Sequence, residues 1–433
     1  MTNYFRALWY LTHLLRHVRW SRQRLLEYQN QRLRRVLRYA YDYVPFYRRK
    51  FKESGVHPND VKTRLDLNQL PIIRKNEIRA NAGDMISRAV DRTRLLSLST
   101  SGSTGEPLFL YVTQAESEYR KAKHLRANIN CGQRPRDRWV TITAPHHFAE
   151  SSKLQRQLGI FVPTPISVFT DPASQVSEAE ALDPDVLDGY SSSLFLLAKT
   201  FREQRKATIH PRFIVGGAEL GDDYSRHFVE KTLEAPFYDQ YSSVEFERMA
   251  WQCPCRAEYH IDADAIIIEF LDGCEDVSSG EKGEIVCTSL FNYAMPLIRY
   301  AIGDIGVPSS GSCQCGRSLP LMHVVEGRKD SLLVLPNGRT LTPRAFTIGM
   351  HMFQYYRQVD QFRVIQRRLD VFELQIKMKP TGVTEAVLEA ALVSHLKRVL
   401  ALDEGLVEFQ VNFLPEIPVH RSGKLMAVIS ECH

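Results

Sequence analysis

Short β-rich runs alternate with helical segments along most of this chain, and this alternation constrains the fold more than any other sequence feature. The pattern starts near residue 92, where a strand-like run enters a Gly/Ser/Thr loop. Strands are predicted at 108–112, 139–143, 213–215, 266–270 and 284–288, with a helix at 114–128. Residues 299–306, rich in polar residues and glycine, are predicted to form a loop. The alternation favours an α/β protein with mixed sheets.

An α+β segment is predicted at the C-terminal end. A Gly-Arg-Lys-Asp turn at 327–330 precedes a predicted strand at 332–335 and a Pro-Asn-Gly turn. Beyond them the pattern predicts helices near 343–357 and 384–400 and strands near 361–377 and 407–414. Because 433 residues are too many for one ordinary core, we divide the chain into an arm at 1–50, a large domain at 51–330 and a small domain at 331–433.

The first 50 residues form a basic arm. They hold twelve Lys and Arg residues against two acidic ones, whereas the remaining residues carry a net charge of −4. Leucines recur at helical spacing on both sides of residue 20, which predicts two helices, and Pro45 ends the pattern. Two interpretations are open. Either the arm only packs on the large domain with its arginines in water, or it also makes a weak contact with an anionic membrane surface or an acidic partner.

Composition and charge exclude several classes of protein. Hydrophobic residues make up 44% of the chain and charged residues 24%, which excludes a disordered or fibrous protein. A nucleic-acid binder would carry its excess positive charge on the folded domains, so no nucleic-acid partner is expected. No apolar run approaches the ~20 residues needed to span a bilayer, and the first residues do not resemble a secretory signal. We therefore expect a cytoplasmic protein.

Three of the eight cysteines and one histidine follow a metal-ligand pattern. Cys253 and His260 lie seven residues apart, and Cys313 and Cys315 form a tight pair further along. A Cys/His pair and a Cys-x-Cys turn together supply four ligands for a tetrahedral zinc ion, which leaves no open position for water and indicates a structural site. Cys255 is an alternative to Cys253, and the opposing interpretation is a set of buried, unpaired cysteines.

The most informative segment for function is a Ser/Thr/Gly loop. Residues 98–107 read Leu-Ser-Thr-Ser-Gly-Ser-Thr-Gly-Glu-Pro. Glycines let backbone N–H groups converge on an anion and the hydroxyls add donors, which suits a triphosphate. The segment is not a Walker A loop, because no Gly-Lys-Ser/Thr ends it and no helix follows directly.

Five further motifs follow in order. They are Gly216–Glu219, Tyr238–Glu245, Arg299–Asp304, Gly327–Asp330 and Arg421–Lys424. Each is weak alone, but the six in this order resemble the acyl-adenylate-forming superfamily, and within it the phenylacetate–coenzyme A ligase-like and capsular polysaccharide biosynthesis (CapK-like) branch. The resemblance runs from about residue 25 to the end. It implies a large N-terminal adenylation domain and a small mobile α+β domain behind it.

The resemblance also implies how the nucleotide is held. The loop would bind the β- and γ-phosphates of ATP, with Thr104 taking part in catalysis. The loop residues concerned are Thr100, Ser101, Gly102, Ser103, Thr104 and Gly105. Gly217, Ala218 and Glu219 would line the adenine, and Tyr241 would stack on it or beside it.

The remaining motifs would supply charge and movement. Glu245 would bind the Mg²⁺ ion that bridges the phosphates, and Asp304 would accept hydrogen bonds from the ribose hydroxyls. Arg328 would assist the ribose or a phosphate, and Asp330 would be the hinge of the small domain. Lys424 would approach the carboxylate and the α-phosphate and neutralise charge as the bond to phosphorus forms.

Two positions depart from the family pattern, and two segments resemble its acyl pocket. The family usually has Gly and Thr or Ser where this chain has Ser242 and Val244, and a valine cannot donate a hydroxyl hydrogen bond to the α-phosphate. The histidines at 146–147 and the segment 188–193 fall where the family lines its acyl pocket, although both could also be simple loop ends.

The resemblance implies an enzyme that activates a carboxylic acid with ATP, releases pyrophosphate and transfers the acyl group to a thiol, in the first place coenzyme A. The implied cofactors are ATP, Mg²⁺, coenzyme A and structural Zn²⁺. The alternatives are transfer to a carrier-protein thiol or an amine, and a weakly catalytic nucleotide-binding scaffold. The acid itself, the final acceptor, the pathway and the oligomeric state stay open.

Overall fold

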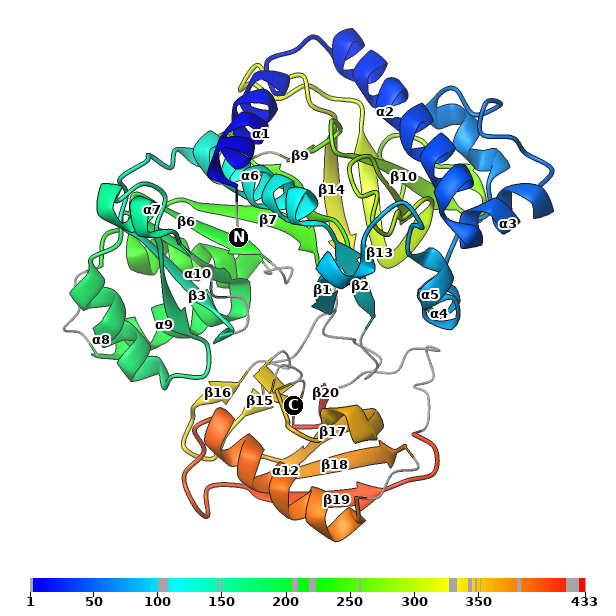
Figure 1. Ribbon diagram of the computed structural model, residues 1–433. Coiled ribbons are helices and arrows are strands. Elements are labelled where there is room, and N and C mark those ends of the chain that lie inside the picture. The colour runs from blue at the N-terminus through cyan, green and yellow to red at the C-terminus, as the bar shows by residue number, and fades with distance from the viewer. Residues whose placement is uncertain are drawn as a thin grey trace.

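A large N-terminal part and a smaller C-terminal lobe make up the molecule in the computed structural model (Figure 1). The structure describes residues 3–99, 108–145, 148, 151–204, 209–217, 223–256, 258–326, 333–341, 345–346, 349–350, 352–379, 383–417 and 428–432. The lobe lies below the large sheet in this view, and the C-terminus lies within it. Phe169, from the large part, packs against the hydrophobic core of the lobe.

One twelve-stranded sheet organises the large part, in the spatial order β11-β10-β12-β13-β14-β9-β8-β7-β6-β5-β3-β4. Its strands are β3 (Trp139–Thr143), β4 (Pro163–Ser167), β5 (Val186–Tyr190), β6 (Phe213–Gly217), β7 (Phe237–Ser243), β8 (Glu247–Gln252), β9 (Tyr259–Ile261), β10 (Ile266–Asp272), β11 (Glu275–Asp276), β12 (Gly283–Ser289), β13 (Tyr300–Ser309) and β14 (Leu321–Glu326). Strands β7, β6, β5, β3 and β4 are parallel, whereas β8 and the strands beyond it are antiparallel. The mixed α/β class predicted from the sequence is confirmed.

Helices cover both faces of the parallel half. Three of them, α8 (Pro172–Leu182), α9 (Ser191–Gln204) and α10 (Asp223–Leu233), share one apolar core with strands β3, β5 and β6. Helix α6 (Gln114–Cys131) lies on the opposite face, where Cys131 packs with Trp139 and Val186. Thr113 and Glu116 form a capping box at its start, and Gly132, at φ 114°, ends it in a left-handed conformation. Short helix α7 spans Lys153–Leu158.

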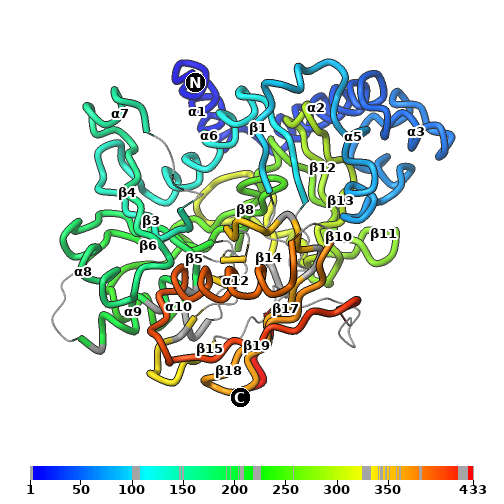
Figure 2. The backbone as a smooth tube through the Cα atoms, turned by 60° about the horizontal axis from the view of Figure 1, so that its bottom comes forward, coloured from blue at the N-terminus to red at the C-terminus, as the bar shows by residue number. Residues whose placement is uncertain are grey.

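The arm and the helices after it pack on the antiparallel half (Figures 1 and 2). These elements are α1 (Tyr4–His17), α2 (Arg22–Tyr43), α3 (Pro45–Glu53), the 3₁₀ turn η1 (Arg64–Gln69), α4 (Lys75–Ala80), α5 (Ala82–Met85) and the 3₁₀ turn η2 (Arg92–Arg94). Leu33, Val36 and Leu37 of α2 are fully buried in the main core, and Leu11 and Leu14 of α1 pack against Ala122 of α6. Among the described residues, no helix combines the length and the apolar character that crossing a bilayer requires.

A small antiparallel pair, β1 (Leu96–Ser99) and β2 (Phe109–Val112), carries the predicted phosphate loop between its ends. Ser99 pairs with Phe109, so the pair closes the loop at its base. Residues 100–107 themselves lie outside the described residues.

The C-terminal lobe has its own sheet and its own core. Its four strands β17 (Val359–Arg368), β18 (Val371–Met378), β19 (Glu408–Phe413) and β20 (Val428–Ser430) run in the order β19-β18-β17-β20. Helix α12 (Glu385–Val399) lies across this sheet (Figure 2), and Leu388, Leu392 and Leu396 join the sheet's core. The hairpin β15 (Leu333–Val334) and β16 (Thr340–Leu341) and the 3₁₀ turn η4 (Tyr356–Gln358) complete the lobe. The strands predicted near 361–377 and 407–414 and the helix near 384–400 are therefore confirmed, whereas much of the helix predicted near 343–357 lies outside the described residues.

One local prediction was incomplete and one was wrong. The two predicted helices end just before Pro45, with α2 ending at Tyr43, but Pro45 also begins α3, because proline in the first helical turn sacrifices no hydrogen bond. Residues 299–306 are not a loop, since β13 runs through them between β12 and β14. The glycines in this strand make it resemble a loop in the sequence. At Gly306 close packing requires glycine, because a Cβ atom would come within 2.8 Å of Phe270 Cε1 and 2.9 Å of Ile285 Cδ1.

A buried ion network joins the arm to the sheet. Arg126 of α6 contacts Asp264 Oδ2 through Nη1 at 2.6 Å and Asp262 Oδ1 through Nη2 at 2.5 Å. His17 of α1 contacts the same Asp264 oxygen at 2.8 Å, and Trp251 Nε1 donates to Asp262 at 2.8 Å. Although burial opposes its ionisation, Arg126 and then His17 hold the pKa of Asp264 far below its usual value. The arm is therefore attached by charge as well as by apolar packing.

We expect Arg126→Met to destabilise the protein by about 3–5 kcal/mol, because it leaves two carboxylates buried without their cation. Arg138→Met is the matched control, since Arg138 pairs with Asp183 and Asp185 on the surface and its loss costs about 1 kcal/mol or less. Urea unfolding followed by tryptophan fluorescence measures both. Equal midpoints for the two variants would contradict the role given to the buried network.

Candidate active site and metal centre

Two residues predicted to hold the nucleotide come together from distant strands. Tyr241 lies on β7 and Asp304 on β13, and the Tyr241 hydroxyl donates a hydrogen bond of 2.6 Å to Asp304 Oδ2. Burial first, and then the neighbouring Asp304 carboxylate, raise the pKa of Tyr241 well above its usual value. Tyr241 is therefore a neutral phenol that fixes one carboxylate oxygen of Asp304.

A bulge in β13 presents Asp304. Ala301 and Ile305 of β13 pair with Val286 and Glu284 of β12, respectively, and no residue between them is paired. Three residues of β13 thus stand opposite one of β12, and the extra length bends the strand outward. Gly303, at φ 89°, makes this path possible because other residues rarely adopt that conformation.

Glu245 sits at the tip of the hairpin that joins β7 to β8. Ser243 pairs with Glu247 across a loop of three residues, Val244–Phe246, and Glu247 adopts the left-handed conformation at φ 63°. The Glu245 side chain is buried, and its Oε1 accepts a hydrogen bond of 3.2 Å from the Tyr300 hydroxyl of β13. The hairpin and the bulged strand therefore place Glu245 and Asp304 both close enough to Tyr241 for their charges to raise its pKa.

Buried cations of α6 hold this hairpin tip in place. Arg120 donates to the carbonyl oxygens of Val244 at 2.6 Å and Glu245 at 3.2 Å, and Lys123 Nζ donates to that of Phe246 at 2.8 Å. Burial lowers the pKa of Lys123 to about 8. A charged donor that satisfies several carbonyls at a turn fixes the turn's backbone more firmly than a neutral donor would. Val244, which departs from the family pattern, thus keeps its backbone position although it lacks a hydroxyl.

The glycine pair at the end of β6 is required by close packing. A Cβ atom at Gly216 would lie 2.0 Å from Cζ of Phe237, and one at Gly217 would lie 3.1 Å from the carbonyl oxygen of Gln240 and 3.5 Å from Nη1 of Arg248. Gly217 pairs with Gln240, the residue before Tyr241. Its backbone, without a side chain, therefore forms a flat wall beside Tyr241. This is the location that the family resemblance implies for the adenine.

The four predicted metal ligands form one cluster. Cys253 follows β8, His260 lies in β9, and Cys313 and Cys315 lie in the connection between β13 and β14. Their ligand atoms lie within 4.8 Å of one another, with Cys253 Sγ 3.5 Å from Cys313 Sγ and His260 Nε2 3.3 Å from Cys315 Sγ. The exposed Cys255 is not a member of this cluster.

The geometry and protonation of the cluster fit a tetrahedral thiolate–imidazole site. Zn–S bonds of about 2.3 Å place two sulfur ligands about 3.8 Å apart, close to the separations found here. Burial, helped by the charge of Arg317, lowers the pKa of His260 to about 4, so the imidazole is neutral, as a ligand must be. His260 Nδ1 is buried and has no hydrogen-bond partner among the described residues.

Several predicted site residues lie outside the described residues. They are Thr100, Ser101, Gly102, Ser103, Thr104 and Gly105 of the loop, Ala218 and Glu219 after β6, Arg328, Asp330 and Lys424, together with His146 and His147 near the predicted acyl pocket. Their roles stay predictions. The structure brings together Tyr241, Asp304 and Glu245 with Gly217, and separately the four metal ligands.

Sequence reasoning missed a group of charged residues under the site. Arg120 and His124 on α6 are remote from every motif in sequence, and a helix rich in charge is ordinarily expected to face solvent. Arg248 on β8 lies just beyond the motif Tyr238–Glu245 but is not part of it. The one available signal was the number of charged residues on α6.

The fold is that of an acyl-adenylate-forming ligase. A solved 2-hydroxyisobutyryl-CoA ligase in complex with 2-HIB-AMP and CoA matches 93% of this chain and 89% of its own length, with a TM-score of 0.64 and 20% sequence identity. The same ligase in an open conformation matches with a TM-score of 0.60. No family model matches the chain.

Sequence relatives indicate the branch. Phenylacetate–coenzyme A ligase of Thermus thermophilus is 26% identical over 94% of this chain and 97% of its own length, and that of Escherichia coli is 27% identical over 86% of each. Protein CapK of Staphylococcus aureus is 24% identical over 65% of this chain and 62% of its own length. These likenesses confirm the predicted resemblance and the predicted class, an AMP-forming ligase.

We expect Gly216→Ala to destabilise the protein by about 1–3 kcal/mol, because the new methyl group collides with the buried ring of Phe237. Gly83→Ala in α5 is the control, since no atom lies within 4 Å of its Cβ position, and its effect is expected to be about 0.5 kcal/mol or less. Thermal unfolding measures both, and adding Phe237→Leu to Gly216→Ala should restore part of the loss. A Gly216→Ala variant as stable as Gly83→Ala would rule out the packing argument.

Proposed function

We propose that this protein activates a carboxylic acid with ATP to an acyl-adenylate, with release of pyrophosphate, and then transfers the acyl group to coenzyme A. The observation that carries the proposal is the convergence of Tyr241, Asp304 and Glu245 beside the bare wall at Gly217. The likeness to phenylacetate–coenzyme A ligases along almost the whole chain supports the same reaction.

Each described residue has a defined task in this proposal. Asp304 would accept hydrogen bonds from the two ribose hydroxyls, a task for which a carboxylate is suited because both of its oxygens are acceptors. Tyr241 would hold that carboxylate in place and lie beside the adenine. Glu245 would hold Mg²⁺, and the metal when bound would neutralise phosphate charge.

The C-terminal lobe would supply the remaining charge. Lys424 would approach the α-phosphate and stabilise the charge that develops as a carboxylate oxygen attacks the α-phosphorus and pyrophosphate leaves. Rotation about Asp330 would then present a second face of the lobe to the acyl-adenylate for attack by the thiol, so that one cavity serves both half-reactions. Transfer to a carrier-protein thiol or an amine is the alternative for the second step.

Two substitutions should separate nucleotide binding from chemistry. We expect Asp304→Ala to weaken ATP binding by about 2 kcal/mol, because the ribose contact is made equally in the ground and transition states. We expect Lys424→Ala to retain ATP binding and to lose acid-dependent exchange between ATP and pyrophosphate. Calorimetry and isotope exchange measure the two effects, with exposed Asp276→Ala and Lys379→Ala as controls.

Exchange with no carboxylic acid, in a folded protein that binds ATP, would favour the nucleotide-binding scaffold over the ligase. Unchanged ATP affinity in Asp304→Ala would refute the ribose contact alone. Exchange in Lys424→Ala within twofold of wild type would remove that lysine from the mechanism.

We propose that Cys253, His260, Cys313 and Cys315 hold a structural zinc ion. Four protein ligands fill a tetrahedral shell, so the metal would join two connections of the sheet without taking part in the reaction. The connection after β8 leads from the Glu245 hairpin, and the connection after β13 leads from the strand that carries Asp304. The ion would thus stabilise the framework of the site from its far side.

Purified protein should contain about one zinc ion per chain, and a strong chelator should lower its melting temperature. Cys313→Ser should lose the metal, because a hydroxyl oxygen is a poor substitute for a thiolate, whereas exposed Cys274→Ser should keep it. Elemental analysis measures the zinc content of the wild type and of both variants, and thermal unfolding measures the melting temperature. A stable, active, metal-free protein would refute the site, and loss of zinc from Cys255→Ser but not from Cys253→Ser would reassign one ligand.

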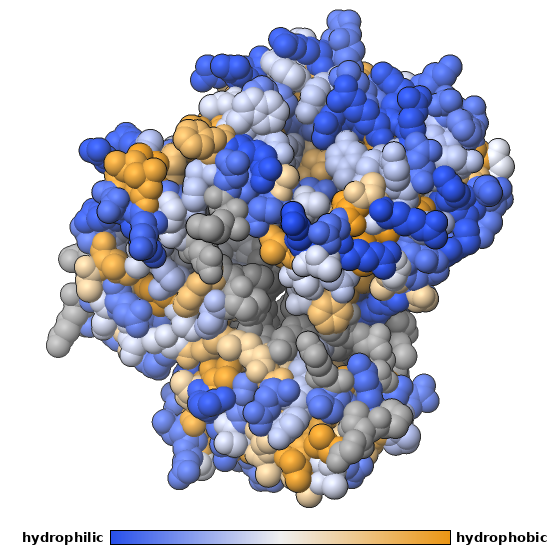
Figure 3. All heavy atoms as spheres, viewed as in Figure 1, coloured by the Kyte–Doolittle hydropathy of each residue, from blue (hydrophilic) through white to orange (hydrophobic). Residues whose placement is uncertain are grey.

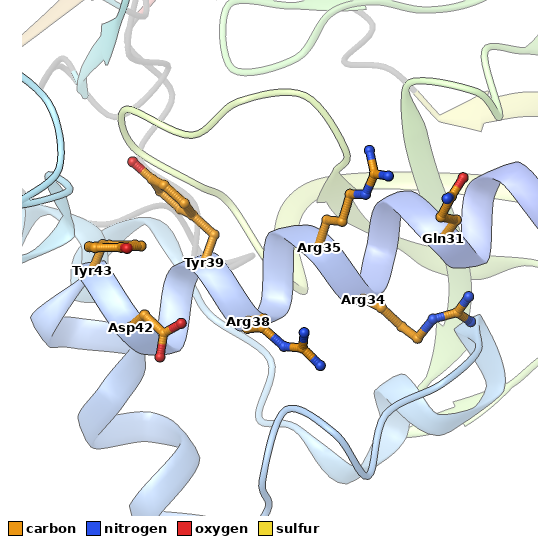
Figure 4. Close-up of a pocket in the computed structure, with 7 residues that line it drawn as sticks. All are labelled: Gln31, Arg34, Arg35, Arg38, Tyr39, Asp42 and Tyr43. Atoms are coloured by element: carbon orange, nitrogen blue, oxygen red, sulfur yellow. The ribbon is translucent and has the colours of Figure 1, made fainter.

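We also propose that the basic arm makes a weak contact with an anionic membrane surface. On α2, a cavity of about 400 Å³ is lined by Gln31, Arg34, Arg35, Arg38, Tyr39, Asp42 and Tyr43 (Figure 4). Arg35 points to one side of the helix and Arg34 and Arg38 to the other. Hydrophilic side chains dominate the surface in this region (Figure 3), while on α1 Phe5 is 89% and Trp9 56% exposed. Exposed aromatic residues beside arginines are typical of an interfacial helix.

Co-sedimentation with phosphatidylglycerol vesicles tests this contact. We expect binding that falls with salt and is lost in the triple variant R34Q/R35Q/R38Q, because about 1 kcal/mol per basic residue is contributed near such a surface. Phosphatidylcholine vesicles are the control. Equal sedimentation with both lipids would contradict the proposal. The basic arm would then serve only to pack on the large domain, with its arginines in water.

A further inference from the structure

A cluster of partly exposed charged side chains joins α6 to strands β5 and β8. Its members are His124 on α6, Asp188 on β5, and Glu247 and Arg248 on β8, and we call this set the polar recess. The side chains of His124, Asp188 and Glu247 are 29%, 15% and 29% exposed, so solvent reaches the recess. Open α/β sheets bind their ligands at the carboxyl ends of parallel strands, and the recess lies beside that edge.

Direct contacts connect its members. Arg248 Nη2 lies 2.9 Å from His124 Nδ1, which lies 3.3 Å from Glu247 Oε1. His124 Nε2 lies 3.7 Å from Asp188 Oδ2, a distance at the long end for an ion pair. Asp188 is therefore the most loosely held acceptor of the recess. Arg248 Nε is buried and has no hydrogen-bond partner among the described residues.

The recess adjoins the proposed adenylation site on two sides. Arg248 Nη1 lies 3.5 Å from the Cβ position of Gly217, the wall proposed to line the adenine. Glu247 is two residues from Glu245, and its Oε2 lies 3.4 Å from Arg120, which also binds the Glu245 carbonyl. An acid joined to the α-phosphate between Gly217 and Glu245 would thus direct its remaining atoms into the polar recess.

The recess holds charged groups of both signs. Burial and the charge of Arg248 oppose protonation of His124, but hydrogen bonds to Asp188 and Glu247 outweigh them and raise its pKa. Against its burial, contact with His124 holds the pKa of Glu247 far below its usual value. A substrate group with a negative charge would face Asp188 and Glu247, and one with a positive charge would face Arg248. The recess therefore calls for a neutral group that both donates and accepts hydrogen bonds.

The backbone of Glu247 supports a functional interpretation over a purely structural one. Glu247 holds a left-handed conformation at φ 63°, which is unfavourable for a residue with a side chain. Glycine is the usual residue there, so the carboxylate is retained at a cost in stability. Residues held in such conformations cluster at ligand sites.

We propose that the polar recess selects a hydroxylated carboxylic acid as the substrate, and that Asp188 and His124 determine this specificity. The proposal rests on the adenylation function proposed above and names its substrate class. A hydrocarbon chain would cover ionised groups without replacing their hydration, whereas a hydroxyl would donate to Asp188 and accept from Arg248 Nε. A site built to bind a hydroxyl rejects the analogue that lacks it far more strongly than an apolar pocket distinguishes chain lengths.

Acid-dependent ATP–pyrophosphate exchange with pairs of acids of the same carbon skeleton tests the proposal. Suitable pairs are butanoate with 3-hydroxybutanoate, hexanoate with gluconate, and phenylacetate with mandelate or 4-hydroxyphenylacetate. For at least one pair, kcat/KM of the hydroxylated acid should exceed that of its partner by about 100-fold or more. Asp188→Val should lower this ratio at least about tenfold and leave the KM for ATP unchanged, because only the acyl end is altered.

Asp188→Asn and Asp185→Asn complete the design. Asp188→Asn keeps the shape and an acceptor oxygen and should retain part of the preference even if Asp188→Val folds poorly. Asp185→Asn, at the start of the same strand, alters only an exposed pair with Arg138 and should leave the ratio unchanged. Hydrocarbon acids used as well as or better than their hydroxylated partners would overturn the inference and leave the ligase function standing. No exchange with any acid, in folded protein that binds ATP, would overturn the proposed function and the inference together.

Discussion

Several charged side chains of helix α6 are buried in the protein, and the geometry of the site depends on the hydrogen bonds that they make. Arg120 and Lys123 bind the carbonyls of the Glu245 hairpin, and Arg126 binds the two aspartates that anchor the arm. One turn earlier, Glu116 accepts the backbone N–H groups of Tyr293 and Ala294 at 2.6 and 3.0 Å. Three segments far apart in the chain are thus fixed by one helix. Because buried ionic hydrogen bonds tolerate little displacement, the helix fixes the positions of these three segments relative to one another.

Much of the fold could be predicted because its elements have local signals. The strand at 139–143 has the predicted bounds. The helix that begins at Gln114 starts with a capping box, a Thr followed three residues later by a Glu, which is visible in the sequence itself. Strand β13 could not be predicted, since Gly303, Asp304 and Gly306 resemble a turn until the neighbours on both sides are known. Strand β20 has only three residues and pairs with β17, 64 residues earlier, so its signal is not local.

The site divides in the same way. The metal ligands could be predicted because two short spacings, Cys-x-Cys and Cys…His, each limit where their ligands can lie. The contact between Tyr241 and Asp304 was not predicted, because spacing gives no sign of it and the family resemblance implied only that both residues hold the nucleotide. Asp188 begins the segment 188–193, which the family resemblance assigned to the acyl pocket. His124 and Arg248 gave no signal, because a charged residue in a helix or strand is ordinarily explained by solvent, and only the packing of α6 against β5 and β8 reverses that expectation.

The bond between His17 and Asp264 spans 247 residues, and this separation affects how the protein is made. At about 5–20 residues per second, roughly 12–50 s pass during translation between the appearance of His17 and the synthesis of its partner. During that interval the arm is an amphipathic, strongly basic helix pair with no sheet to cover it, on a ribosome whose surface is RNA. Until Asp264 is made, His17 lacks its buried partner, and the leucines of the arm lack the sheet residues that bury them. In this protein, the arm is made long before the residues that hold it in place.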